Sequence, residues 1–258
     1  MMQVSLIAHT PEPEKLIAAA AKMCYSPSKA QDLLDDLDAG KIERFIRMLM
    51  SLGHESPVEH VSFTFAVEGV SRSLLAQITR HRIASFSVKS QRYVREGSFE
   101  YVIPPEIDAV PEAREVYLKM MQEDQAAYDV LSDLLYKKHY ERLVKGGVSS
   151  DKAKTDAEKM AIEDARYVLP NACETKLMLT MNVRSLYNFF RLRCCMRAQW
   201  EIRELSEKML ALCYEVSPAL FAKAGPSCTY GECSEGKMCC GNQKLMREKY
   251  AKIKEIKK

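Results

Sequence analysis

The densest cluster of polar side chains in this sequence lies between Arg80 and Tyr93. In order, its residues are Arg80-His81-Arg82-Ile83-Ala84-Ser85-Phe86-Ser87-Val88-Lys89-Ser90-Gln91-Arg92-Tyr93. Guanidinium groups hold phosphate oxygens through paired hydrogen bonds, and serine hydroxyls add short directional bonds. The charge of such a run, taken alone, favours a solvated basic surface. The spacing of the residues therefore has to distinguish a phosphate site from an ordinary surface.

Three other segments combine charged, amide and apolar residues in distinctive patterns. They are Gly53-His54-Glu55-Ser56-Pro57-Val58-Glu59-His60, Glu163-Asp164-Ala165-Arg166-Tyr167-Val168-Leu169-Pro170 and Asn182-Val183-Arg184-Ser185-Leu186-Tyr187-Asn188-Phe189-Phe190-Arg191-Leu192-Arg193. The Arg80–Tyr93 cluster itself has Arg-His-Arg, seven residues, a serine, and an arginine two positions later. These four segments, in this order, resemble the flavin-dependent thymidylate synthases. The resemblance runs from about Val4 to Pro218.

Apolar periodicity predicts a few short strands. Residues 4–8 are apolar and β-branched, and residues 61–67 and 175–181 alternate between apolar and polar side chains, as half-buried strands do. Residues 85–97 are mixed, and we expect a loop there with a short extended piece.

Helical spacing dominates the rest of the chain. One helix is opened by residues 11–14, and residues 32–52 carry a second helical pattern, divided near 39–40 and stopped by Gly53. Further helices are expected over 71–82, 111–145 (after a turn at 104–105), from a cap at 149–151 to Pro170, and over 184–215 in two pieces.

These elements predict a helix-rich α+β fold, and the resemblance implies a single domain with a small, mostly antiparallel sheet. We expect a catalytic domain over residues 1–224 that binds FAD and dUMP. Residues 225–258 form a cysteine-rich, basic tail, in which 244–258 have a helical pattern.

Composition excludes several classes of protein. The 258 residues are 47% hydrophobic and 28% charged with a formal net charge of +3, which is ordinary for a globular chain and too weakly basic to predict a nucleic-acid polymer or a membrane surface as partner. No apolar run reaches the roughly 18 residues of a membrane span, and the first residues lack the basic region of a signal peptide. We therefore expect a cytoplasmic protein, whose nine cysteines are mostly reduced.

The resemblance implies the reductive methylation of dUMP to dTMP. The carbon donor is 5,10-methylenetetrahydrofolate, and NADPH is the reductant acting through FAD. In that family the reduced flavin delivers a hydride to the pyrimidine, so no covalent protein nucleophile is required. We expect Cys194 and Cys195 to be buried as small apolar side chains without a catalytic role. The family also implies a homotetramer with shared active sites.

The resemblance assigns substrate contacts residue by residue. Arg193 would lie against the uracil ring, where a fixed cation favours negative charge on N3–C4–O4. The Ser90 hydroxyl is not ionised near neutrality, so we expect it to orient dUMP rather than attack it. The full set for dUMP is Gln77, Arg80, Ser90, Arg92, Arg166 and Arg193, of which Arg193 and Ser90 are the expected catalytic residues.

A second set would hold FAD. Arg184 and Asn188 are four residues apart and share a helix face, and Arg193 lies about three turns beyond Asn182. His54 would lie by the flavin and folate rings, with Glu59 near the flavin nucleotide. The expected FAD residues are Ser56, Glu59, Arg80, His81, Arg82, Ile83, Asn182, Arg184 and Asn188.

Several of these residues also fit simpler structural roles. His54 and His60 are six apart with a proline between them, which does not fit the zinc-protease pattern of two histidines four apart, so no metal is expected. Asn182 and Asn188 also suit a helix start and a surface. Val88 departs from the family, whose members often carry Glu or Gln two residues before the signature serine.

The tail cysteines have no assigned role. Cys228, Cys233, Cys239 and Cys240 have spacings of five, six and one, which do not match a paired Cys-x-x-Cys zinc site. Free or redox-active thiols are favoured, ahead of a metal site or a disulfide.

Two other functions remain in competition. The Arg80–Tyr93 segment also suits a basic, aromatic-interleaved patch that binds RNA or single-stranded DNA. The same pocket would also serve another flavoprotein or a nucleotide-binding regulator.

Overall fold

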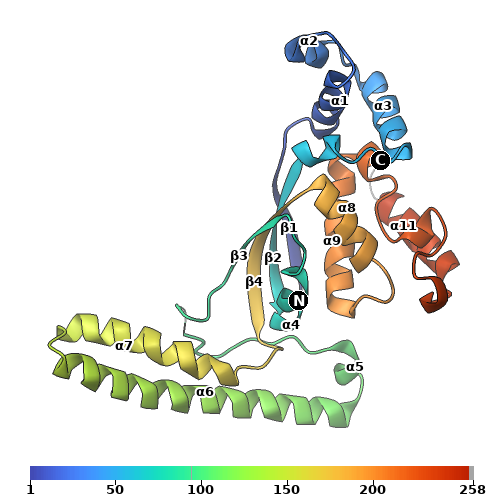
Figure 1. The fold of residues 1–258 in the computed structure, drawn as a ribbon. Coiled ribbons are helices and arrows are strands. Elements are labelled where there is room, and N and C mark those ends of the chain that lie inside the picture. Colours follow the sequence, from blue (N-terminus) through green and yellow to red (C-terminus); the bar gives the residue numbers. More distant parts are fainter. Residues whose placement is uncertain (94, 256–258) are drawn as a thin grey trace. The chain divides into compact units, whose positions relative to one another are not determined.

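The computed structural model describes residues 1–93 and 95–255. The chain forms two compact units, and it passes between them several times. The first unit comprises Gly69–Leu75 and Val88–Lys176, together with Met1, and the second comprises Met2–Glu68, Ala76–Ser87 and the chain from Leu177 onward. Figure 1 shows the elements of both.

A four-stranded antiparallel sheet is formed by the described residues. Its order is β1-β2-β4-β3, with β1 at Gln3–His9, β2 at Ser62–Ser71, β3 at Ala84–Val88 and β4 at Glu174–Asn182. Strands β1 and β2 pair from Gln3 opposite Glu68 to His9 opposite Phe63, with an irregularity between Leu6 and Ala8. On β2 and β4, the hydroxyls of Thr64 and Thr180 lie 2.9 Å apart.

The core of the second unit lies under one face of this sheet. Burial alternates along β2 from Ser62 to Glu68, so Phe63, Phe65 and Val67 all point inward and are fully buried. The ring of Phe63 packs edge-on against Phe221, with centroids 5.5 Å apart. Phe221 also contacts Phe190, so the strand and the helices that cover it share one aromatic cluster.

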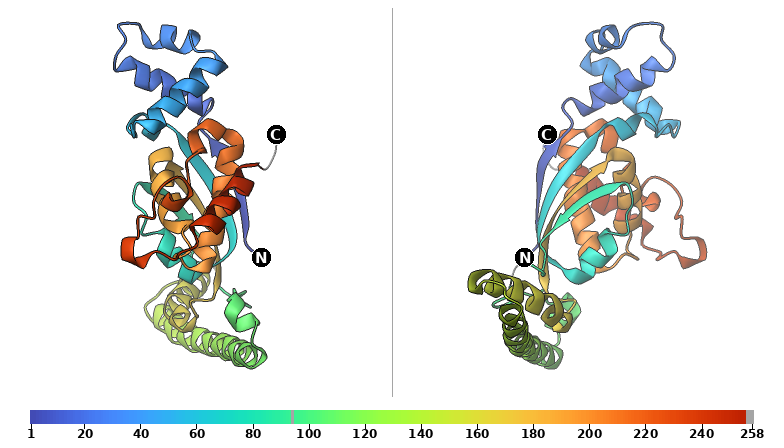
Figure 2. Two further views of the ribbon diagram at one scale, coloured as in Figure 1. Left: turned by 90° about the vertical axis from the view of Figure 1, so that its right-hand side faces the viewer. Right: turned by 60° about the vertical axis from the view of Figure 1, so that its left-hand side comes forward.

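Helices α8 (Val183–Arg193) and α9 (Trp200–Val216) lie on that face of the sheet (Figures 1 and 2). Helix α11 (Gln243–Glu255) packs against α9, and the Tyr250 hydroxyl of α11 donates to the carbonyl of Cys194 at 3.0 Å. The remaining elements of this unit are α1 (Pro13–Met23), α2 (Ala30–Asp35), α3 (Ala39–Ser51), α10 (Pro218–Phe221), α11 (Gln243–Glu255) and the 3₁₀ turns η1 (Pro57–His60), η3 (Ser227–Thr229) and η4 (Gly236–Met238).

The first unit is built on an antiparallel pair of long helices. Helix α6 (Pro111–Lys145) packs along α7 (Ser150–Ala165), as Figure 1 shows. Tyr128, Ile162 and Ala165 form a buried cluster between them. This unit also holds α5 (Pro105–Asp108) and η2 (Arg166–Val168), whereas α4 (Arg72–Ile78) starts in the first unit and ends in the second.

Most predicted elements are confirmed. Helix α6 has the predicted bounds, and the pattern over residues 32–52 divides where α3 begins at Ala39. Gly53, which follows α3 and its C-cap residue, has the positive φ of 73° that favours glycine. Within the described residues, no helix has the length and apolar content needed to cross a membrane.

Three local predictions need correction or stay open. The helix expected over 71–82 ends at Ile78, and residues 79–83 form a turn and a bend before β3. Residues 84–88 form a full strand, whereas mainly loop was expected. Val94 and residues 256–258, which fell within an expected loop and an expected helix, lie outside the described residues. The domain boundary near residue 225 stays a prediction.

Replacing Phe63 by alanine should lower the free energy of unfolding by about 3–5 kcal/mol, because a fully buried ring is lost and the rigid cluster leaves a cavity. Chemical denaturation measures this. Met178→Ala on β4 is the matched control, since Met178 is 45% exposed and its loss should cost well under about 1 kcal/mol. Equal effects of the two changes would contradict the assigned core face.

Candidate active site

Helix α8 and its N-cap residue carry four of the predicted site residues, which are Asn182, Arg184, Asn188 and Arg193. Asn182 is its N-cap, and its side-chain oxygen accepts a hydrogen bond from the Ser185 amide at 2.9 Å. Such a cap satisfies one of the free amides at a helix start. The side-chain oxygen of Asn182 therefore caps the helix, as its position at a helix start suggested. The cap fixes where the following side chains of α8 point.

Arg184, in the first turn of α8, is exposed and forms ion pairs with two carboxylates. Its Nη1 contacts Glu59 of η1, and its Nε lies 3.4 Å from Glu55. Both acids belong to the Gly53–His60 segment, so this pair of contacts fastens that segment to α8. His54 and Ser56, in the same segment, are exposed.

The last turn of α8 brings Arg193 to His81. Arg193 Nε donates to His81 Nε2 at 2.9 Å, and the His81 ring packs edge-on against Phe189 with centroids 5.0 Å apart. Burial, with a smaller effect of the Arg193 charge, lowers the pKa of His81 from 6.5 to about 4. The imidazole is therefore neutral near pH 7 and acts as a hydrogen-bond acceptor for the guanidinium.

Arg80 and Arg193 lie close enough to repel one another. Burial lowers the pKa of Arg193 from its usual value, and the charge of Arg80 lowers it further. Within the described chain, no carboxylate forms an ion pair with Arg80, Arg82 or Arg193. Arg80 is exposed and Arg193 is half-buried, and two neighbouring guanidinium groups without an acid between them favour binding of an anion.

The chain between Arg82 and β3 makes an unusual turn. Ile83 has a φ of 60°, a conformation that costs a β-branched residue free energy. Its carbonyl accepts a hydrogen bond from the Ser185 hydroxyl at 3.0 Å, which anchors the turn to the first turn of α8. The Ile83 side chain is 73% exposed, so it is available to a bound molecule.

Three predicted dUMP residues gather within the first unit. Arg92 Nε forms a 2.7 Å ion pair with Glu163, and the Arg92 amide donates to the Ser90 hydroxyl at 3.2 Å. Arg166 Nε donates to the Glu163 carbonyl at 3.0 Å. Glu163 thus organises both arginines. The other predicted dUMP residues, Gln77, Arg80 and Arg193, belong to the second unit.

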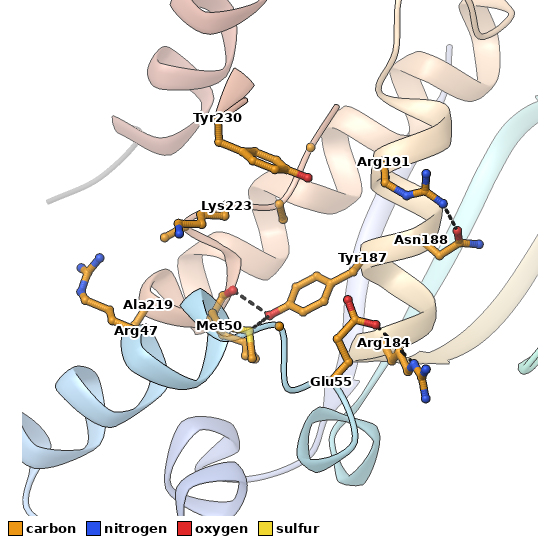
Figure 3. A pocket seen from close by; sticks show the side chains of 15 residues that line it. Arg47, Met50, Glu55, Arg184, Tyr187, Asn188, Arg191, Ala219, Lys223 and Tyr230 are labelled. Carbon is orange, nitrogen blue, oxygen red and sulfur yellow. Dashed lines mark hydrogen bonds and ion pairs between the residues drawn. The ribbon is translucent and has the colours of Figure 1, made fainter. Parts of the chain in front are cut away.

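The second unit also contains a cavity of about 680 Å³ beside α8. Figure 3 shows its lining, with Arg184, Tyr187, Asn188 and Arg191 from α8 and Lys223 and Tyr230 from the segment after α10. Tyr187 donates to the Leu220 carbonyl at 2.7 Å, and Arg191 donates to the Asn188 side chain at 2.9 Å. The cavity is rich in cations and carries two phenol rings, which suits an anionic, aromatic molecule.

Sequence reasoning found some of these lining residues and missed others. Arg184 and Asn188 share a face as expected and both line the cavity. Tyr187 and Arg191 lie three and seven residues after Arg184, which places them on the same helix face. Their spacing in the sequence could therefore have predicted them as lining residues. Lys223 and Tyr230 had no signal, because the fold of the segment after α10 brings them to α8. Of the two cysteines after α8, Cys194 is buried, whereas Cys195 is only half-buried.

The sequence matches a known protein family over most of its length. The sequence profile of a family described as "Thymidylate synthase complementing protein" matches residues 5–219. A flavin-dependent thymidylate synthase from Clostridium tetani is 52% identical over 249 residues, which cover 96% of this chain and 97% of that protein. The chain belongs to the flavin-dependent thymidylate synthase family.

Other relatives agree with this family assignment. A flavin-dependent thymidylate synthase from Geobacter sulfurreducens is 43% identical, over 96% of this chain and 99% of its own length. Among solved structures, a UMP/dUMP methylase, PolB from Streptomyces cacaoi with bound 5-Br dUMP, matches with a TM-score of 0.58 and covers 86% of this chain and 94% of that one. At 24% identity, the match to this solved structure shows a shared fold. That fold agrees with the helix-rich α+β fold predicted from the sequence.

The neutral state of His81 should be visible in its titration. In nuclear magnetic resonance spectra the His81 ring should titrate near pH 4 rather than near 6.5, since burial disfavours its charged form. Between these two pH values the unfolded chain binds more protons than the folded one, so stability should fall as the pH falls from about 6.5 to about 4. His81→Asn, which keeps an acceptor for Arg193, should lessen that fall. A ring that titrates near pH 6.5 would contradict the described contact.

Proposed function

We propose that this chain methylates dUMP to dTMP, with 5,10-methylenetetrahydrofolate as the carbon donor, NADPH as the reductant and FAD as the cofactor. The names of its relatives, at up to 52% identity over nearly the whole chain, support this activity. The observation that carries it is local. Arg80 and Arg193 lie close to one another without a carboxylate partner in the described chain, beside a histidine that is neutral at working pH.

Arg193 is the proposed electrostatic catalyst. Its guanidinium is oriented by His81 through the 2.9 Å hydrogen bond, so little reorganisation is needed when negative charge develops on N3–C4–O4 of the uracil. A half-buried, preoriented cation stabilises such charge far more than a solvated one. The low pKa of His81 means that this ring does not add a competing positive charge.

The phosphate and ribose of dUMP are assigned to Gln77, Arg80, Ser90, Arg92 and Arg166. In the first unit, Arg92 and Arg166 are already held by Glu163, and the Ser90 hydroxyl lies beside the Arg92 amide. The Arg92–Glu163 pair is substantially exposed, with 47% and 43% of the two side chains accessible. Exposed pairs contribute little stability, so Arg92 can exchange its carboxylate partner for a phosphate at small cost.

Two of the proposed FAD residues, Arg184 and Asn188, line the cavity beside α8, and the other proposed residues are not part of its lining. The cavity volume falls within the range of about 300–1,000 Å³ that is usual for cofactor sites, and its cations and phenol rings suit a pyrophosphate and a flat ring. FAD, when bound, supplies the hydride transfer that no side chain can perform. The proposed FAD residues are Ser56, Glu59, Arg80, His81, Arg82, Ile83, Asn182, Arg184 and Asn188, with His54 beside the flavin and folate rings.

The setting of the enzyme is also part of the proposal. We infer a cytoplasmic homotetramer whose active sites are shared between subunits, with dUMP and reduced folate as partners and no nucleic-acid polymer. Light scattering of the purified protein gives the subunit count. A monomer with full turnover would rule out shared sites.

The absorption spectrum of the purified protein tests the function as a whole. A flavin spectrum is expected, together with NADPH oxidation that responds to dUMP and formation of dTMP when the folate is added. A colourless protein that cannot be reconstituted with FAD, and that instead binds RNA or single-stranded DNA in a salt-dependent manner, would support the competing basic patch. Bound flavin without dTMP formation would indicate a different flavoprotein.

Replacing Arg193 by alanine should leave FAD bound and lower the rate of dTMP formation by about 100-fold or more, as loss of a preoriented electrostatic group does. Flavin absorbance and single-turnover methylation measure the two effects separately. Arg44→Ala, at an exposed position of α3, is the matched control for loss of a helix arginine outside the site. Unchanged methylation in Arg193→Ala would remove this residue from the mechanism.

Replacing Ser90 by alanine should raise the KM for dUMP by roughly tenfold, the effect of losing one hydrogen bond to a charged group, while flavin content stays the same. Steady-state kinetics and the flavin-to-protein ratio test this. Ser87→Ala, an exposed serine on β3, should change neither quantity. Loss of FAD from Ser90→Ala would mean that Ser90 belongs to the flavin site.

A further inference from the structure

Ser90 opens a tight turn that leaves its hydroxyl proton available. The Ser90 carbonyl accepts a hydrogen bond from the Tyr93 amide at 3.5 Å, and its Oγ accepts one from the Arg92 amide at 3.2 Å. Serine turns of this kind direct a lone pair of the hydroxyl back to the chain. Among the described residues, no acceptor takes the Ser90 O–H. This proton can therefore be donated to a bound molecule.

A buried ion pair spans this turn. Lys89 directly precedes Ser90, and its Nζ lies 2.9 Å from both carboxylate oxygens of Glu96. The Glu96 side chain is 7% exposed and that of Lys89 is 28% exposed. Exposed ion pairs contribute little, whereas loss of one partner from a buried pair leaves an uncompensated charge. The pair therefore restrains the chain on both sides of the turn.

Glu96 is itself fixed to helix α6 through its backbone. Its amide donates to the Tyr128 hydroxyl at 3.3 Å, and its carbonyl accepts a hydrogen bond from Gln125 Nε2 at 3.3 Å. Tyr128 is fully buried in the cluster between α6 and α7. Gln125 also accepts a hydrogen bond from the Phe99 amide at 2.8 Å. The Glu96 carboxylate thus projects from a segment that α6 holds in place.

Two other contacts hold the opposite side of the turn. The Lys89 amide donates to the Lys176 carbonyl of β4 at 3.0 Å. Gln91, which is buried, donates through Nε2 to the thiol of Cys173, just before β4, at 3.3 Å. These contacts fasten the turn to β4 and the residue before it. The ion pair adds the link to α6, because it joins Lys89 to a residue that α6 holds.

We propose that Glu96 is a positioning residue for dUMP, which acts through Lys89 to hold the Ser90 hydroxyl in its donating orientation. This inference rests on the proposed function, in which Ser90 contacts the nucleotide. A donor that is already oriented binds with a smaller loss of conformational freedom. Arg92 depends less on this link, since Glu163 holds its guanidinium at 2.7 Å.

The test measures dUMP binding to the FAD-loaded protein by calorimetry. Glu96→Gln keeps the size of the side chain and removes its charge, so Lys89 loses its ionic partner. The dissociation constant for dUMP should rise severalfold, up to the roughly tenfold expected for loss of the Ser90 hydrogen bond. Flavin content and turnover at saturating dUMP should stay within about twofold of wild type, because the change affects binding rather than the chemical step.

Glu123→Gln is the matched control. Glu123 of α6 pairs with Lys119 at 3.8 Å in the same unit, and both side chains are exposed, so dUMP affinity should not change. Thermal denaturation shows whether each variant is folded. The double change Lys89→Met and Glu96→Gln leaves neither partner of the pair charged, so it supplies the same comparison if the single variant does not fold.

Two measurements separate positioning from a general loss of stability. In a Ser90→Ala background, Glu96→Gln should change the dUMP dissociation constant by less than about twofold, because residues that act through one contact are not additive. In hydrogen exchange, the amides of Arg92 and Tyr93, both bonded to Ser90, should exchange faster in Glu96→Gln. The amides of α7 should exchange at the wild-type rate, because local opening does not involve that helix.

The outcomes distinguish this inference from the proposed function. Wild-type protein that binds dUMP, with unchanged affinity in Glu96→Gln, would overturn the inference and leave the proposed function in place. An equal effect of Glu96→Gln with and without the Ser90 hydroxyl would also overturn the inference, because Glu96 would then act by another route. Wild-type protein that binds neither FAD nor dUMP would overturn the proposed function, and this inference with it.

Discussion

The hydrogen bond from Arg193 to a neutral His81 is the contact on which the candidate site depends. A half-buried guanidinium is stable only if its donors find acceptors, and a carboxylate in that place would cancel the charge that the site needs. A neutral imidazole satisfies one donor and leaves the positive charge intact. Burial of the His81 ring against Phe189 keeps its pKa at about 4, so packing in the core sets the charge state in the site.

Helix α8 joins this electrostatic arrangement to the fold. Its inner face, with Phe189 and Phe190, packs into the aromatic cluster under β2, while its other faces carry Arg184, Asn188 and Arg193. The Asn182 cap and the Ser185 contact to Ile83 fix the start of the helix and the turn before β3 together. Site residues that are distant in sequence therefore share one rigid support, as a preorganised site requires.

Charged residues in this chain divide into two kinds. Arg92 and Arg184 are exposed and rest on acids, where the ion pairs add little stability but restrict the side chains. Arg80 and Arg193 have no ion pair in the described chain and repel each other, which costs stability in the free protein. In the proposed function a bound nucleotide anion relieves that repulsion. Strain of this kind is typical of ligand sites, where local stability is given up for binding.

The sequence alone determined the family, the helix-rich fold, and the helices and strands with strong periodicity. Helix α6 is predictable to the residue, because apolar spacing and the flanking proline and glycines act locally. The residue types of the candidate site are also predictable, since the four segments that resemble the family contain them. The strand at 84–88 is not, since its apolar signal is short and its pairing with β4 is non-local.

Only the tertiary structure decided which charges are neutralised and which are left free. The pairing of Arg184 with Glu59 and the neutral state of His81 both depend on distances between segments that periodicity does not fix. Lys223 and Tyr230 reach the cavity for the same reason. Sequence spacing governs neighbours on one helix or strand, whereas Coulomb energies and burial depend on positions in space, and those are set by packing.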